Sequence, residues 1–214
     1  RDVAIVSTVI IASQFTRIGF TWITATVLGL LLPGGKGALA GLPMIAGLAG
    51  LTIVAEFFQY WIHRWAHNPL RHPLLHGMHR AHHSAPYVNV TLLYLGMTGA
   101  TTVFYLTIMA WNALTHSDWR WDDSIIRHVP GGTRIISTLE WVLVTPRIHH
   151  THHGYGKDGK VYRNFCTLLS GYDRLFGTLH VPDGRPWRDG LPGGDYAWWR
   201  ELVFPLVPLG EAEK

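Results

Sequence analysis

The sequence predicts an all-α fold, an integral-membrane helical bundle with a cytoplasmic cap of short helices that carries histidine boxes. Three apolar runs, residues 3–32, 38–62 and 88–114, are each long enough for a transmembrane helix, which needs about 20 residues. The chain of 214 residues is 48% hydrophobic and only 15% charged, a low charge content for a soluble domain. Histidines recur at helical spacing beside these runs, which predicts short helices there.

The first two apolar runs are expected to form an antiparallel transmembrane hairpin. A glycine-rich turn at 33–37 separates them. Arg17 interrupts the first run, where it either snorkels or marks a break between an interfacial helix and the span. The third run, 88–114, has two interpretations, because the chain must return to the side on which it began. It is either a re-entrant pair broken near Gly96 and Gly99, or a span followed by a segment, 121–146, that runs deep in the membrane.

The distribution of charge predicts the topology. Of the 18 Lys and Arg residues, only Arg1, Arg17 and Lys36 precede His63, so the histidine-rich side is expected to be cytoplasmic. No basic stripe with interleaved aromatic residues accompanies the net charge of +4, which argues against a nucleic-acid partner. The single cysteine, Cys166, excludes an internal disulfide and a cysteine-rich metal site. There is also no glycine-rich nucleotide motif and no Gly-x-Ser-x-Gly elbow, so the chemistry must come from metals.

Histidines in three groups are the candidate metal ligands. The first group has a pair at i and i+4, and the other two share the pattern HxxHH, so each group can occupy one face of a helix. Neutral imidazole is the commonest side-chain metal ligand and suits iron, zinc and copper. Eight imidazoles are too many for one ion but fit two ions side by side. The predicted ligands are His63, His67, His79, His82, His83, His149, His152 and His153.

The order HxxxH, HxxHH, HxxHH resembles the fatty acid hydroxylase/sterol desaturase superfamily, which comprises membrane-bound di-iron oxygenases. The stretch Glu56-Phe-Phe-Gln-Tyr-Trp-Ile-His63 before the first box and Asp173-Arg-Leu-Phe-Gly-Thr178 after the third support the resemblance, which covers roughly residues 50–180. It implies two iron ions, with zinc as the other metal that a preparation could hold. It also implies O2-dependent hydroxylation or desaturation of a lipid, with electrons from a ferredoxin or cytochrome.

The chain departs from the family pattern in one place. Relatives carry a further histidine, within a His-Ser/Ala-Asn stretch, about 25 residues before the third box. The nearest match here is Asp122-Asp123-Ser124-Ile125, with His116 and His128 nearby. Asp123, through its carboxylate, and His128 are therefore the candidates for an additional ligand.

Other polar residues near the boxes are expected to support the ligands. Glu56 lies two helical turns before His63 and is predicted to accept an N–H from a ligating imidazole. The alternative is a carboxylate paired with an arginine at the membrane surface. Asn164 matches an asparagine of the family and is expected to position the third box, through a metal-bound water. Asp173 and Arg174 are expected to form a structural ion pair and helix cap.

We expect a single membrane-embedded domain, in a multi-pass protein of a bacterial cytoplasmic membrane with its metal site on the cytoplasmic side. Its segments are a transmembrane hairpin (1–62), the first two boxes (63–87), the third apolar segment (88–114), the third box with the cap (115–180) and an interfacial tail (181–214). Two other functions fit the histidines: a zinc-dependent membrane hydrolase or reductase, and a non-catalytic metal carrier or sensor. Sterols, acyl chains, sphingolipid bases, ether lipids and carotenoids all fit as substrates.

Overall fold

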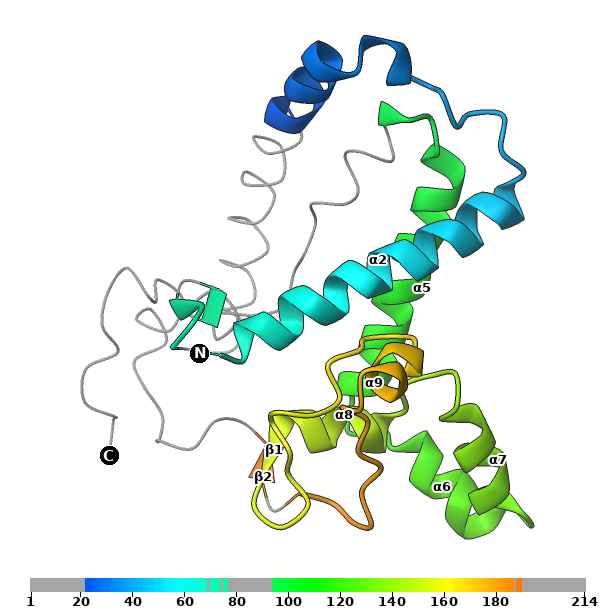
Figure 1. Ribbon diagram of the computed structural model, residues 1–214. Coiled ribbons are helices and arrows are strands. Elements are labelled where there is room, and N and C mark those ends of the chain that lie inside the picture. The colour runs from blue at the N-terminus through cyan, green and yellow to red at the C-terminus, as the bar shows by residue number, and fades with distance from the viewer. Residues whose placement is uncertain (1–21, 69, 74, 77–93, 187, 190–214) are drawn as a thin grey trace, which may run out of the picture. The chain divides into compact units, whose positions relative to one another are not determined.

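The computed structural model describes residues 22–68, 70–73, 75–76, 94–186 and 188–189, and it is mostly helical (Figure 1). A short apolar helix, Trp22–Leu31, comes first. It is followed by η1 (Pro33–Gly35), α2 (Met44–Ala66), α5 (Thr98–His116), α6 (Trp121–His128), α7 (Gly132–Leu139), α8 (Pro146–His153) and α9 (Gly171–Leu175). Two short strands, β1 (Gly154–Tyr155) and β2 (Arg188–Asp189), pair antiparallel, with Gly154 opposite Asp189. The helical prediction is confirmed.

One helix of the described residues, α2, is long and apolar enough to cross a membrane. It has 23 residues, with His63 in its last turn and His67 directly after its end. It begins at Met44, six residues later than the apolar run, because turns occupy residues 36–41 and the Pro43 carbonyl accepts the first helical hydrogen bond, from Gly47. The wider membrane bundle stays a prediction.

The chain divides into two compact units, which are described separately. The first contains residues 1–55, 77–105 and 195–214, and the second contains 56–76 and 106–194. In the first unit, Gly96 adopts a φ of +92° immediately before α5, and an added Cβ there would lie 2.9 Å from Ala40. The third apolar run is therefore interrupted at Gly96, whereas Gly99 lies inside α5.

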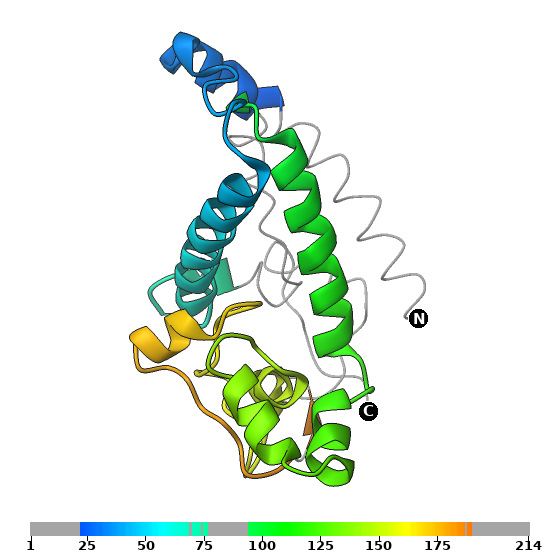
Figure 2. The ribbon, with the colours of Figure 1, turned by 90° about the vertical axis from the view of Figure 1, so that its right-hand side faces the viewer.

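The second unit is built on an aromatic core. Tyr60 of α2 is fully buried, stacks on Phe176 at a ring-centroid distance of 5.0 Å, and hydrogen-bonds through its hydroxyl to Thr178. The other members of this core are Val144, Ile148, Phe165 and Cys166, which are all buried. The core thus joins the C-terminal half of α2 to α8 and to the chain around α9, and both views show α9 beside α2 (Figure 1 and Figure 2).

The short helices α6 and α7 form a tight pair (Figure 1). Gly131 takes a left-handed φ of +75° between them, and an added Cβ at Gly132 would collide with the carbonyl of Ile125. Glycine is therefore required at the start of α7. This pair places Asp122 and Glu140 next to the beginning of α8, which carries the third histidine box.

Candidate metal centre

A first cluster contains three imidazoles from two helices. His63 lies in the last turn of α2, His67 directly follows the end of that helix, and His152 comes from α8. One ligand nitrogen from each ring lies within 4.8 Å of the other two. The ring centroids of His63 and His67 lie 4.5 and 4.7 Å from that of His152. The first and third boxes therefore meet in the folded chain.

A second cluster contains His149 and His153 of α8 together with His116, the last residue of α5. The Nε2 atom of His149 lies 2.9 Å from that of His116 and 3.0 Å from that of His153. Three ring nitrogens thus converge on one small volume. His150, in the same helix, is buried but is not a member of either cluster.

Helix α8 supplies both clusters. His149 and His153 are four residues apart and share a face, whereas His152 points to the first cluster. The ring centroids of His152 and His153 are only 5.2 Å apart, so the two clusters are neighbours. All six histidines belong to the second compact unit.

Backbone carbonyls fix the orientation of three of these rings. The Nδ1 atoms of His63 and His152 lie 2.6 Å and 2.7 Å from the carbonyl oxygens of Phe165 and Arg163, and Nδ1 of His116 lies 2.8 Å from that of Asn112. A carbonyl can only accept a hydrogen bond, so Nδ1 must carry the proton. In the neutral ring, Nε2 then has the free lone pair that a metal requires.

Burial also favours the neutral form of these rings. Desolvation lowers the pKa of His152 and outweighs the hydrogen bond to Arg163, which raises it. Desolvation likewise lowers the pKa of His116. A neutral imidazole is the ligand form, so the environment prepares both clusters for a metal ion.

Two buried carboxylates hold the loop that orients the first cluster. Asp173 accepts hydrogen bonds from the amides of Phe165 and Cys166, each at 2.8 Å, and from the hydroxyl of Thr178 at 2.7 Å. Glu56 accepts from the amides of Leu168 and Leu169, each at 2.9 Å. The acids therefore clamp residues 165–169 from two sides.

These contacts correct two expectations. Glu56 bonds to backbone amides, not to an imidazole or an arginine, so any support that it gives to His63 passes through the loop. Asp173 does not pair with Arg174, whose guanidinium carbon instead lies 3.7 Å from the ring centroid of Trp141. Each carboxylate takes amide donors because those N–H groups would otherwise be buried without acceptors.

Asn164 directly precedes this loop and holds its backbone in place. It has a left-handed φ of +58°, the one positive value for a non-glycine residue in the described chain. Its side-chain amide donates to the carbonyls of Ile148 and His180, and its Oδ1 accepts from the amide of His180 at 2.6 Å. Asn164 thereby ties α8 to the loop whose carbonyls at 163 and 165 bind His152 and His63. This placement supports the predicted positioning role, through direct backbone contacts.

Replacing Asn164 with Ala should destabilise the protein by about 2–4 kcal/mol. Alanine would leave buried backbone groups without partners and would also strain the left-handed backbone. Asn164→Gly is the matched control, because glycine loses the hydrogen bonds but tolerates the positive φ. Chemical unfolding of the two variants should therefore rank Gly between Ala and the parent chain. Equal stability of all three would contradict this role.

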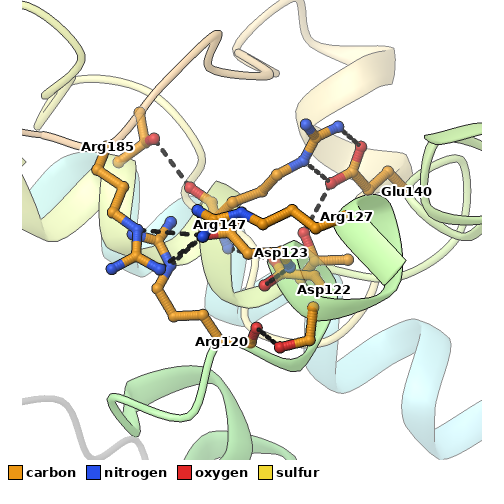
Figure 3. Close-up of polar contacts among 10 residues, drawn as sticks. Arg120, Asp122, Asp123, Arg127, Glu140, Arg147 and Arg185 are labelled. Carbon is orange, nitrogen blue, oxygen red and sulfur yellow. Dashed lines mark hydrogen bonds and ion pairs between the residues drawn. The ribbon is translucent and has the colours of Figure 1, made fainter. Parts of the chain in front are cut away.

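The N-terminus of α8 is anchored by two further buried acids (Figure 3). Asp122 accepts a hydrogen bond from the backbone amide of Arg147 at 2.7 Å. Glu140 binds the guanidinium of Arg147 through two contacts of 2.6 Å and also accepts from the hydroxyl of Thr145. A carboxylate at a helix N-terminus satisfies free amides and complements the helix dipole. The helix that carries both clusters is thus held in place at its beginning.

The structure does not bring Asp123 or His128 to either cluster. The carboxylate of Asp123 binds Arg185 at 2.8 Å, with Arg120 and Arg127 at 3.4 and 3.8 Å (Figure 3). Three guanidinium groups already neutralise this charge. His128 is exposed, and its Nδ1 lies 3.0 Å from the carbonyl of Ser124, one turn earlier in α6.

His116 occupies the position that had been assigned to Asp123 or His128. The sequence offered a signal for it, since His116-Ser117 matches the first two residues of the family's His-Ser/Ala-Asn stretch. His116 lies 33 residues before His149, further than the 25 or so expected, and α6 and α7 lie between them. The predicted ligands His79, His82 and His83 lie outside the described residues, and their role stays a prediction.

The donor atoms of both clusters fit a metal ion. Nitrogens bound at about 2.0–2.1 Å to a tetrahedral ion lie roughly 3.4 Å apart, so only a small movement of the rings would be needed. An all-imidazole set of this kind suits iron, zinc or copper and disfavours magnesium or calcium, which prefer oxygen. Three ligands in each cluster would leave coordination positions for further protein ligands, water or substrate.

Comparison with known proteins identifies the family. No curated protein sequence and no solved structure gives a significant match to the chain. The family model described as fatty acid hydroxylase matches residues 48–178, which is more than half of the chain and includes all six clustered histidines. The chain therefore belongs to the fatty acid hydroxylase family, within the fatty acid hydroxylase/sterol desaturase superfamily.

Proposed function

We propose that this protein is a membrane-bound di-iron oxygenase that hydroxylates or desaturates a lipid at an unactivated C–H bond. The observation that carries the proposal is the pair of adjacent three-histidine clusters, linked by α8, in a chain of the fatty acid hydroxylase family. Two neighbouring redox metals can share the electrons that the reduction of O2 requires. A metal carrier needs only one binding site and no such pair. Membership of this family supports a lipid-modifying oxidoreductase over a metal carrier or sensor.

Each histidine has a defined task in this proposal. One iron would be held by His63, His67 and His152, and the other by His116, His149 and His153. The histidines of the second box, at 79, 82 and 83, would complete the coordination. When bound, the irons would supply the reduction of O2 and the removal of hydrogen from the C–H bond.

The rest of the chain would orient and shield this centre. The carbonyls of Arg163 and Phe165 hold His152 and His63 in the ligating tautomer. The ring of Phe165 packs at 5.7 and 5.4 Å from the rings of His63 and His67, which keeps water from that side of the first cluster. Since the centre lies at the end of α2, a lipid chain could reach it from the bilayer.

The overall reaction requires an external reductant. Hydroxylation converts one C–H bond to C–OH and reduces the second oxygen atom to water, with two electrons and two protons supplied. Desaturation removes two hydrogens and, with the same two electrons and two protons, reduces both oxygen atoms to water. The sequence carries no flavin or haem motif, so we assign the electrons to a ferredoxin or cytochrome on the cytoplasmic side.

Metal analysis combined with lipid profiling tests this function. Cells that express the parent chain should contain lipids that have gained one oxygen or lost two hydrogens, and cells that express His149→Ala should not. The purified parent protein should contain iron and consume O2 when it is given lipid extract and a reduced ferredoxin. Under labelled O2, a hydroxylated product should carry one labelled oxygen atom.

A zinc enzyme is the competing interpretation, because three histidines also form a common catalytic zinc site. It predicts stoichiometric zinc and no O2 uptake with any reductant. That result would contradict the oxygenase and favour a hydrolase or reductase. Labile metal without lipid turnover would favour a carrier or sensor.

A further inference from the structure

The compact unit that contains the histidine clusters also presents an exposed surface of aromatic residues and arginines. We call it the Trp–Arg surface. It contains two stacked pairs, with the guanidinium carbon of Arg64 5.4 Å from the ring of Trp61 and that of Arg174 3.7 Å from the ring of Trp141. Its remaining members are Trp65, Val142 and Leu175, which are 45%, 58% and 71% exposed.

The three segments that carry these residues pack against one another. Residues 141–143 lie beside the start of α9, since the amide of Ser170 donates to the carbonyl of Val142 and Leu143 forms a bridge with Leu169. The end of α9 packs on α2, with ring centroids of Trp61 and Phe176 5.1 Å apart. The exposed residues therefore lie on adjacent segments, from the last turns of α2 through α9 to residues 141–143.

In these segments the acidic side chains are buried, whereas the arginine side chains reach the surface. Glu56, Glu140 and Asp173 point inward and are 2%, 2% and 0% exposed. Arg174 is exposed and Arg64 is partly exposed, so among the described residues of the Trp–Arg surface the charged side chains are both positive. This pattern is complementary to a layer of anionic phosphates. Exposed tryptophans beside arginines are also typical of the membrane–water interface.

We propose that the Trp–Arg surface lies in the headgroup layer of an anionic membrane, where Arg64 and Arg174 bind lipid phosphates. The surface is continuous with α2, the described helix that can cross a bilayer. The tryptophan rings would occupy the boundary between headgroups and acyl chains. The side chains of Val142 and Leu175 would insert into the same boundary. His63 lies between Trp61 and Trp65 on α2, so the first cluster would be held at the depth of the headgroups.

Spin labels at two exposed positions test the depth of this surface. Val142→Cys and Leu175→Cys are labelled in the full-length protein, which is reconstituted in vesicles of phosphatidylcholine and phosphatidylglycerol. Tyr162→Cys is the matched control, since Tyr162 is 66% exposed in the loop after β1. The parent chain gives the background, because its one cysteine, Cys166, is 1% exposed.

Labels at 142 and 175 should collide more with O2, which dissolves in the bilayer, than with a water-soluble nickel chelate. The label at 162 should show the reverse. Contact of all three labels with the nickel chelate would overturn the proposal. Protection of 142 and 175 only after addition of the electron donor would also overturn it and would identify the surface as a protein-docking site.

A second variant tests the recognition of phosphate by the same surface. Arg174→Gln should lower the preference of the protein for short-chain phosphatidylglycerol over phosphatidylcholine by about fivefold, which corresponds to about 1 kcal/mol. Arg127→Gln, at an exposed arginine of α6, is the control and should leave the preference unchanged. An equal loss in both variants would indicate a general charge effect and would contradict a specific phosphate contact at Arg174.

Discussion

His152→Ala should release one of two metal ions per chain and lower turnover by more than about 100-fold, since loss of even a supporting residue around a metal commonly costs 10–100-fold. His152 joins the first cluster to α8, and the ring is buried at 2% exposure. His116→Ala should release the other ion, from the second cluster. The double variant should therefore be free of metal. Elemental analysis of the purified proteins measures all three outcomes.

His128→Ala is the control for both variants. This histidine is exposed and lies outside both clusters, so the variant should retain two ions and full turnover. Two ions in both His152→Ala and His116→Ala would show that the clusters are not the metal sites. Complete loss of metal from either single variant would show that the two sites do not fill separately.

Asp173→Ala should destabilise the protein by about 3–5 kcal/mol, because two buried amides and one buried hydroxyl would lose their acceptor. The carboxylate is 0% exposed and binds the amides of Phe165 and Cys166 and the hydroxyl of Thr178. The loop that orients His63 would loosen with it, so metal affinity should fall as well. Denaturant unfolding in detergent and metal competition with a chelator measure the two effects.

Two further variants test whether the loss of stability is specific to the buried carboxylate of Asp173. Asp173→Asn keeps one acceptor oxygen and should be destabilised by less than Asp173→Ala. Asp183→Ala removes an exposed carboxylate and should leave stability within about 0.5 kcal/mol of the parent, as most surface substitutions do. A loss as large in Asp183→Ala as in Asp173→Ala would point to a general charge effect in place of the proposed clamp.

Part of the candidate metal centre followed directly from the spacing of histidines. A pair at i and i+4 must share a helical face, and His63 and His67 do meet in one cluster. The same rule grouped His149, His152 and His153, yet the structure divides them between two clusters. A ring at i+3 lies to one side of the face that i and i+4 share. Whether it joins them depends on which other elements pack against the helix, and sequence spacing does not contain that information.

The supporting contacts were harder to predict. The cost of a buried charge indicated that Glu56 needs a partner, but its partners are amides more than a hundred residues away, at Leu168 and Leu169. His116 was noted but not chosen as a ligand, because it lies 33 residues before His149 and the expected spacing is about 25. Hydropathy located α2 and the helical run of α5, since membrane-length apolar segments have a strong signal. The ends of these helices depend on local turns at Pro43 and Gly96, which hydropathy does not report.

The burial of Cys166 has a consequence for the durability of such an enzyme. This thiol is the only one in the chain, and it follows Phe165, whose carbonyl contacts His63. Burial, with the nearby carboxylates of Asp173 and Glu56, raises the pKa of the Cys166 thiol far above its usual range. Oxidants attack the thiolate, so a sulfur that stays protonated is chemically quiet. In the proposed oxygenase, the one thiol of the chain would thus stay in the protonated form, which resists oxidation.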